Sequence, residues 1–458
     1  MLLAKLLEIM GDWRLMFPQD RTFRRAVRQS VGSMCSLGRR TISRALCCLG
    51  RDQQDWSADY RVHSRSKWDD AELFEPILRR AHPLCGEEYV SVGFDDGHLK
   101  KTGRMVPGAS YWADPLSPPF RVNLMWGLRY LQASLFVPHY RTSEVGARGL
   151  PIRFREVPAV KRPGKRASAE EREAYRQAVK EHNMSTAFVQ ELRALRTMLD
   201  RAGGETKKLV VALDGSFCNR ACFGADVERV LLVARARRDA KLCAPAPQGG
   251  RRVYDAHKFT PESVRQDESV PWRVTRIFHG GCWRDVRYKD IEHVLWQGGT
   301  RRKPLRLFVI APTPYKVRPN GRTFYRQPAY LFCTDCAASV DVVLQAYFDR
   351  WQIEVNHREQ KDTLGVGQAQ VWSEKSVPRQ PALMVASYSA LLLAAIEVYG
   401  SQRTDAFMKL PKWRNGSSRP SLLDLITQVR REIADEPACA APFELTVTLE
   451  QLVLTAAA

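Results

Sequence analysis

Residues 347–361 of the 458-residue chain read YFDRWQIEVNHREQK, and this stretch decides how the rest is interpreted. In a helix, at about 100° per residue, Tyr347, Arg350, Glu354 and Lys361 lie within about 60° of one another. One carboxylate, two cations and a phenol then share a single stripe. Such a set suits a site where the carboxylate holds a metal ion while Arg and Lys bind phosphates.

A second stripe on the same helix is apolar. It consists of Phe348, Trp351 and Val355, and it predicts that this side packs against a core. The alternative is an ordinary amphipathic helix with a solvated charged face, because charged faces are common on helices. The geometry of the helix alone does not separate the two interpretations.

Two apolar segments upstream each run into an aspartate. Residues 89–96 (YVSVGFDD) alternate like a strand, which puts the apolar side chains on one face and Asp95 on the other. Residues 207–215 (KKLVVALDG) are more continuously apolar, as in a central buried strand, and stop at Asp214. Carboxylates at strand ends lie at the rim of a sheet, where α/β folds place their sites. The alternative for Asp95, Asp96 or Asp214 is a turn or helix-capping role.

The spacing Tyr-x2-Arg-x3-Glu-x6-Lys resembles the YREK signature of DDE transposases from bacterial insertion sequences. Residues 365–372 (GVGQAQVW) and the long apolar segment after them also look like that family. The resemblance covers about residues 90–400 and implies an α/β fold with a ribonuclease-H-like mixed sheet flanked by helices. It also implies that Asp95, Asp214 and Glu354 hold two Mg²⁺ ions, which Mn²⁺ can replace. The implied reaction is two-metal phosphoryl transfer that cleaves DNA at element ends and joins it to target DNA.

The first acidic position departs from the family pattern. Relatives read Asp-Asp-Thr, whereas this chain reads Asp95-Asp96-Gly97. Counting from the missing threonine, together with strand parity, favours Asp95 as the catalytic ligand and keeps Asp96 as the alternative. Lys100 and Lys101 follow closely and are candidate phosphate-binding residues.

The net charge indicates a polyanionic partner. The chain has 71 Lys plus Arg against 50 Asp plus Glu, a formal charge of +21. Nucleic acid is the expected partner for such a basic chain, and the resemblance implies double-stranded DNA bound by a homodimer. Candidate phosphate contacts are Tyr347, Arg350 and Lys361 of the signature, and Arg235 at the exit of the apolar segment 230–235.

The chain shows features of a cytoplasmic protein. No signal peptide is evident, and the eleven cysteines lack the paired spacing of secreted disulfide scaffolds. The one membrane-like run, residues 382–398, contains Glu397 and is short for a bilayer span. We therefore expect a buried core helix there and no membrane association.

The Arg-rich N-terminal region, residues 1–80, is expected to be helical. Residues 21–30 and 37–46 read as two helices separated by a break at Gly32, which suits a DNA-binding helix-turn-helix. The alternative is a helical cap packed on the catalytic core. The residues that would contact DNA are Arg39, Arg40 and Arg44.

The rest of the chain is divided around the signature. The gap from Asp214 to Glu354 is much longer than a helix crossover needs, which predicts an insertion. Within the first part of the core, residues 161–166 (KRPGKR) form a basic link expected to face solvent, and residues 167–202 read as helical. The expected units are a catalytic core over 85–241, a β-rich insertion over 242–337, the second part of the core with the Glu helix over 338–400, and a C-terminal helical region over 401–458.

Two other functional classes share these features. One is a transposase-derived protein that binds DNA without catalysis, which the presence of all three carboxylates disfavours. The other is a metal-dependent nuclease on the same kind of core, which cuts DNA without joining it. The products formed from labelled DNA ends in Mg²⁺ or Mn²⁺ separate the three classes.

Overall fold

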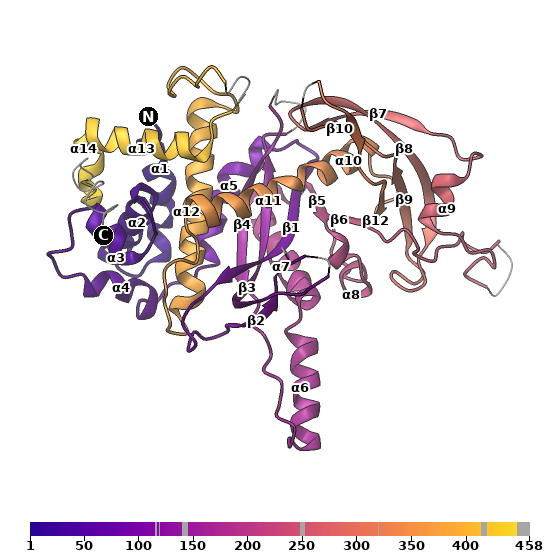
Figure 1. Cartoon of the computed structure of the whole chain (residues 1–458), viewed down its shortest axis with the longest axis horizontal. Helices are drawn as coiled ribbons and strands as arrows, with labels where there is room; N and C mark the ends of the chain where they lie inside the picture. Colours follow the sequence, from indigo (N-terminus) through magenta and orange to yellow (C-terminus); the bar gives the residue numbers. More distant parts are fainter. Residues whose placement is uncertain are drawn as a thin grey trace.

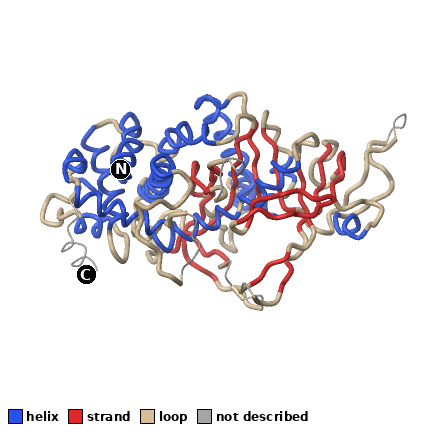
Figure 2. The backbone as a smooth tube through the Cα atoms, turned by 90° about the horizontal axis from the view of Figure 1, so that it is seen from above, coloured by secondary structure: helices blue, strands red, loops and turns tan. Residues whose placement is uncertain are grey.

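The computed structural model describes residues 1–114, 117–118, 120–139, 145–247, 252–318, 320–413 and 419–446. The expected C-terminal region, 401–458, therefore lies partly outside the described residues. Helices gather toward one end of the molecule, while strands occupy the middle and the other end (Figure 2). The fold is a mixed α/β fold in which helices flank a sheet, as the sequence predicts.

Ten strands of the described chain form one mixed sheet. Their order is β2-β3-β1-β5-β6-β12-β9-β8-β7, and β4 also pairs with β3. A separate two-stranded ribbon joins β10 to β11. The strands are β1 (Tyr89–Lys100), β2 (Ser110–Ala113), β3 (Leu124–Val137), β4 (Arg148–Glu156), β5 (Lys208–Leu213), β6 (Val230–Arg235), β7 (Arg273–His279), β8 (Cys282–Leu295), β9 (Pro304–Ile310), β10 (Pro314–Lys316), β11 (Thr323–Tyr325) and β12 (Ala329–Cys333).

Strand β1 carries the first pair of aspartates. It runs parallel to β5 as far as the pair Phe94–Leu213, and antiparallel to β3 as far as Lys100. The prediction that this strand ends at Asp95 and Asp96 is wrong. The strand continues because β3 supplies hydrogen-bonding partners beyond the point where β5 stops.

The region between Asp214 and the signature helix, the helical stretch over residues 347–361, extends the same sheet. Its last strand, β12, pairs antiparallel with β6, and β9, β8 and β7 follow outward in turn. The strands of residues 242–337 therefore continue the same sheet, because β12 is hydrogen-bonded to β6, the strand that follows Asp214. A short helix, α9 (Pro261–Gln266), lies within this region.

Two sets of helices cover the two faces of the sheet around β1. Helix α7 (Met184–Leu199) packs on one face, where Phe188 lies against Phe94 with ring centroids 5.1 Å apart. Helices α10 (Val340–Asp349) and α11 (Trp351–Arg358) pack on the other face. The helix expected over 167–202 is two helices, because Asn183 caps α7 anew after α6 (Ala169–Glu181) has ended.

The N-terminal helices share a hydrophobic core with the long helix α12 (Ser376–Tyr399) and with α13 (Leu422–Asp435). Most of α12 is buried, so the prediction of a core helix in this run is confirmed. Its length and composition would also allow it to cross a membrane, but most of its side chains face protein. The N-terminal helices are α1 (Leu2–Gly11), α2 (Asp20–Cys35), α3 (Ile42–Cys48), α4 (Ser57–Ser64) and α5 (Glu75–Ala81).

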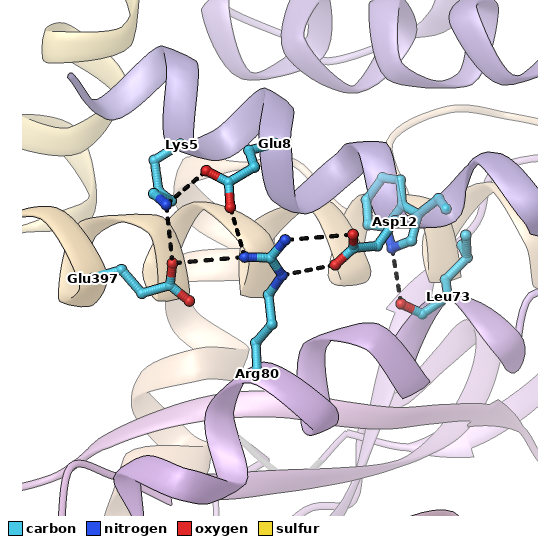
Figure 3. Close-up of polar contacts among 7 residues, drawn as sticks. Lys5, Glu8, Asp12, Leu73, Arg80 and Glu397 are labelled. Atoms are coloured by element: carbon cyan, nitrogen blue, oxygen red, sulfur yellow. Dashed lines mark hydrogen bonds and ion pairs between the residues drawn. The ribbon is translucent and has the colours of Figure 1, made fainter.

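An ion-pair network joins α1 to α5 and α12 (Figure 3). The Arg80 guanidinium lies 2.7 Å from Asp12, 2.8 Å from Glu8 and 3.9 Å from Glu397. Lys5 pairs with both Glu8 and Glu397. The hydrogen bonds to Asp12 and Glu8 raise the pKa of Arg80, so the centre of the network stays charged.

The predicted helix break at Gly32 is wrong, because α2 continues to Cys35. A Cβ atom at Gly32 would lie 2.7 Å from the Leu49 side chain and 3.0 Å from the Ala45 carbonyl oxygen. The glycine therefore permits a close helix crossing between α2 and the α3 segment. The next helix begins at Ile42, later than predicted.

Candidate active site

The register of the central strands places two predicted aspartates side by side. Phe94 lies opposite Leu213 in the parallel pair, so the following residues, Asp95 and Asp214, are neighbours where β5 ends. Adjacent strands are about 4.8 Å apart. Ser216 donates two hydrogen bonds to one Asp214 oxygen, from its amide (2.9 Å) and its hydroxyl (2.6 Å), which fixes that carboxylate at the sheet edge.

Strand alternation turns Asp95 toward the signature helix. Gly93, two residues earlier and on the same face, lies against α11, where a Cβ atom would come 2.4 Å from the Ile353 Cδ1 atom. Phe94 points to the opposite face and packs on α7. The face that carries Asp95 is therefore the face covered by the helix that carries Glu354, in agreement with the predicted parity.

The Arg350 guanidinium joins two of the three predicted carboxylates. Its Nη1 atom lies 3.7 Å from an Asp95 oxygen, and its Nη2 atom donates to Glu354 at 2.9 Å. Burial raises the pKa of Asp95 to about 7; Arg350 opposes this shift, and the negative charges of Asp214 and Asp96 add to it. Two acidic side chains from distant parts of the chain, Asp95 and Glu354, thus pair with one cation, and Asp214 lies beside Asp95.

Asp96 lies in different surroundings. Burial raises its pKa as well, and the Arg129 guanidinium opposes that shift. Arg129 stacks over the Trp112 ring at 4.4 Å, and His98 contacts the same ring at 5.5 Å. Burial, with Arg129 and Lys361 nearby, lowers the pKa of His98 to about 4, so this imidazole is neutral at pH 7.

Gly97 lies where a neighbouring tyrosine needs the space. Gly97 lies opposite Tyr130 on β3, and a Cβ atom there would come 2.5 Å from the tyrosine hydroxyl oxygen. On the same side, the Lys361 Nζ atom is 5.8 Å from the Tyr130 ring centroid. Burial lowers the pKa of Lys361, and Asp95 and Asp96 partly oppose this shift. Tyr130 belongs to the site, yet no motif in the sequence marks it.

The signature stretch is helical but not one regular helix. Helices α10 and α11 meet at Arg350, and a π-helical turn, Glu359–Thr363, carries Lys361. The predicted apolar stripe is wrong at Trp351, which is 56 % exposed, whereas Phe348 packs against a buried cluster. Ile353 is the buried residue instead, because Gly93 on the sheet leaves room for it.

A cavity with a volume of about 660 Å³ opens beside the signature helix. Phe348 forms part of its wall and stacks on His279, with centroids 4.6 Å apart. Two arginines in this wall, Arg326 and Arg419, lie in segments without any recognisable motif, so sequence reasoning missed them. The predicted residues that line the cavity are Tyr347, Arg350, Glu354 and Arg235.

The two lysines at the end of β1 have different environments. Lys101 is 5 % exposed, and its ammonium group donates to the carbonyl oxygens of Gly367 and Ala369, each at 3.0 Å. The prediction that Lys101 binds phosphate is therefore wrong: this ammonium group anchors the loop after the signature helix. Lys100 is exposed and lies 3.8 Å from Asp114.

The predicted DNA-reading helix packs on that same loop. The Arg40 amide donates to the Gln368 side chain at 2.7 Å, and Ile42 packs with Ala369. Arg39 and Arg40 precede α3, so the predicted second helix does not contain them. Arg40 and Arg44 are half-buried and Arg39 is exposed, an arrangement that resembles the alternative of a helical cap on the core.

The acidic residues supply suitable ligands for Mg²⁺, which prefers carboxylate oxygens. Within the described residues, however, no three acidic, His or Cys side chains are arranged as a ligand cage. The Arg350 guanidinium lies between Asp95 and Glu354, where a shared ion would bind. The carboxylate oxygens thus suit Mg²⁺ as ligands, and the Arg350 guanidinium occupies the position between Asp95 and Glu354.

No protein-family model matches the chain, and no curated protein matches it either.

Proposed function

We propose that this protein is a DDE transposase, which cleaves DNA at the ends of a mobile element and joins those ends to target DNA. One observation carries the proposal: Asp95 lies beside Asp214 on the neighbouring strand, and Arg350 joins Asp95 to Glu354. These are the three acidic residues that the motif resemblance selects.

The order of the strands supports a ribonuclease-H-like core. The antiparallel strands β3 and β4 follow β1, and the parallel strands β5 and β6 complete this half of the sheet. The signature helix lies across the face that carries Asp95. A β-rich segment between β6 and α10 matches the insertion that the resemblance implies.

In this proposal Asp95, Asp214 and Glu354 hold two Mg²⁺ ions, which Mn²⁺ can replace. When bound, the ions lower the pKa of the attacking water or 3′-hydroxyl and stabilise the leaving oxygen. Arg350 leaves the carboxylates and binds a phosphate beside the cut, where its planar guanidinium can form two parallel hydrogen bonds. Lys361 supplies a second positive charge on the same side.

The proposed partner is double-stranded DNA, held by a homodimer because two element ends are cut together. The formal charge of +21 supports a polyanionic partner. Arg235, Tyr347 and Arg350 line one cavity next to Glu354, where a DNA strand can enter. The proposed place of action is the cytoplasm, at the bacterial nucleoid.

A strand-transfer assay tests the proposal. Labelled duplexes that carry the DNA flanking the coding region are incubated with the protein in Mg²⁺ or Mn²⁺. We expect joined products, which Asp214→Asn or Glu354→Gln abolishes while DNA binding persists. The matched controls, Asp226→Asn and Glu228→Gln, change exposed acidic residues near β6 and should retain activity.

Each alternative has its own outcome in this assay. Cleavage without joining would indicate a nuclease, and a mobility shift without cleavage would indicate a DNA-binding protein. Joining that survives both Asp214→Asn and Glu354→Gln would remove these residues from the mechanism.

A further inference from the structure

One helix of the molecule has no core to pack on. Helix α6 has no buried residue and extends away from the rest of the structure (Figure 1). We call residues 158–183, which include α6 and the extended segment before it, the arm. Thirteen helical residues span about 20 Å at 1.5 Å per residue, so the arm ends well clear of the sheet.

The extended segment of the arm carries a concentrated positive charge. Lys161, Arg162, Lys165 and Arg166 are all exposed, and no acidic residue occurs from 157 to 169. None of these four side chains forms an ion pair within the described chain. A polyanion can therefore reach every one of them.

Local interactions keep α6 helical without tertiary packing. Ser168 and Glu171 form a reciprocal capping box at its start, and Arg172 donates to the Lys165 carbonyl oxygen at 2.9 Å. Glu173 and Arg176 pair at 2.9 Å. Because an isolated helix of this length is marginal in water, these contacts are what hold the basic segment away from the body.

The root of the arm is hydrogen-bonded to a candidate catalytic loop. At the start of α7, Ser185 accepts a hydrogen bond from the Asn219 side chain at 3.0 Å. The same Asn219 amide group donates to the Ser216 carbonyl oxygen at 2.9 Å, and the Ser216 hydroxyl donates to Asp214. The arm thus leaves the body beside one of the three carboxylates.

We propose that the arm holds the phosphate backbone of duplex DNA next to the cleavage site, through Lys161, Arg162, Lys165 and Arg166. The position of the DNA rests on the proposed function, whereas the choice of a phosphate backbone rests on the charge of the arm. Base pairs are spaced 3.4 Å apart, so an arm of about 20 Å reaches phosphates about six base pairs from its root.

Salt-dependent binding tests the arm independently of catalysis. The four basic residues are changed together to Gln, and binding of a random 40-base-pair duplex is followed by fluorescence anisotropy between 50 and 200 mM salt. Log K falls as log salt rises, and each lost phosphate contact reduces the steepness of this fall by about 0.9. We therefore expect the slope of the variant to be shallower by about 3 to 4. Thermal unfolding should be unchanged, because all four positions are exposed.

A matched control reverses the sign of the charge that is removed. Glu170 and Glu181 are exposed on the same arm, and their joint change to Gln should leave DNA binding unchanged or tighter. If DNA binding weakens in this acidic-residue variant and stays unchanged in the basic-residue variant, the basic side chains do not hold the DNA and the proposal is overturned. An unchanged salt slope in the basic-residue variant, or no binding of the duplex by the unmodified protein, would overturn it too.

The two proposals fail in different ways. A protein that needs the arm for binding but never cleaves contradicts the transposase and leaves the arm standing. If the basic-residue variant joins DNA normally and its salt slope is unchanged, only the proposal that the arm binds DNA is contradicted. A hydroxyl-radical footprint on element-end DNA adds position: protection about six base pairs from the cut should disappear in the basic-residue variant, and protection that persists there would contradict the placement.

Discussion

The two sides of β1 carry adjacent carboxylates in unlike surroundings. On one side, Asp95 faces α11 and meets Arg350, whose other nitrogen binds Glu354. On the other side, Asp96 lies near Arg129, which stacks on an aromatic ring. Both carboxylates are largely buried with raised pKa values, yet Asp95 alone is linked through Arg350 to the signature helix. Strand parity therefore gives these neighbouring residues different partners.

The largest expected effect separates the two aspartates directly. Asp95→Asn should lower the rate of DNA cleavage about a thousandfold or more, because the variant loses one of the three carboxylates proposed to hold the metal ions. Asp96→Asn should lower it less than about tenfold, since its partner is Arg129 on the opposite face. Single-turnover cleavage of labelled duplex in Mg²⁺ measures both variants. Equal losses would break the comparison, and a larger loss in Asp96→Asn would exchange the two roles.

A smaller effect is expected for the arginines on the two sides. Arg350→Lys keeps the charge but loses the planar fork that can bind a phosphate twice, so cleavage should slow about ten- to a hundredfold. Arg129→Lys is the matched change beside Asp96 and should slow cleavage by a few-fold at most. The same single-turnover assay applies. If Arg129→Lys proves the more damaging change, Arg350 is not the phosphate-binding residue.

A substitution at Gly97 tests how closely side chains pack on the Asp95 side of β1. Gly97→Ala forces a Cβ atom into the Tyr130 ring, which should destabilise the fold by about 1–3 kcal/mol in denaturant unfolding. Gly164→Ala, at an exposed position with open space, should cost under about 0.5 kcal/mol. The penalty at Gly97 should shrink in a Tyr130→Leu background. An unchanged penalty there would show that another neighbour causes it.

The smallest effect concerns pH and the metal-free protein. The folded pKa of Asp95, about 7, lies above its ordinary value of 3.8, so the folded state binds this proton more tightly. The stability of the fold therefore falls as pH rises from about 4 to 7. Asp95→Asn removes that loss and should be more stable than the unmodified protein at pH 8. Unfolding in EDTA across this range measures it, and a difference that persists at pH 4 would point to another cause.

The positions of the candidate site residues were predictable where the signal is local. The spacing of the signature selected Glu354 and Arg350, and strand alternation selected the face of Asp95. Both depend on the period of one element, which a sequence displays directly. The mixed α/β class follows from the same kind of pattern.

The failures have a common cause in tertiary contacts. Lys101 reads as a surface cation, yet the loop after the signature helix folds over it and accepts its hydrogen bonds. Gly32 reads as a helix break, yet it serves a helix crossing. Trp351 reads as core, yet the room left by Gly93 draws Ile353 inward instead. Each outcome depends on a partner that is distant in sequence, which no local pattern reveals.

The carboxylate that caps the first turn of α1 belongs to Glu432, more than 400 residues later in the chain. The Leu2 and Leu3 amides, which have no partner within their own helix, donate to the Glu432 carboxylate at 3.1 and 2.6 Å. During synthesis on the ribosome, α1 leaves the exit tunnel long before residue 432 has been added. The α1 amides lack this partner until α13 emerges, so the helical end of the molecule can close only after residue 432 has been added.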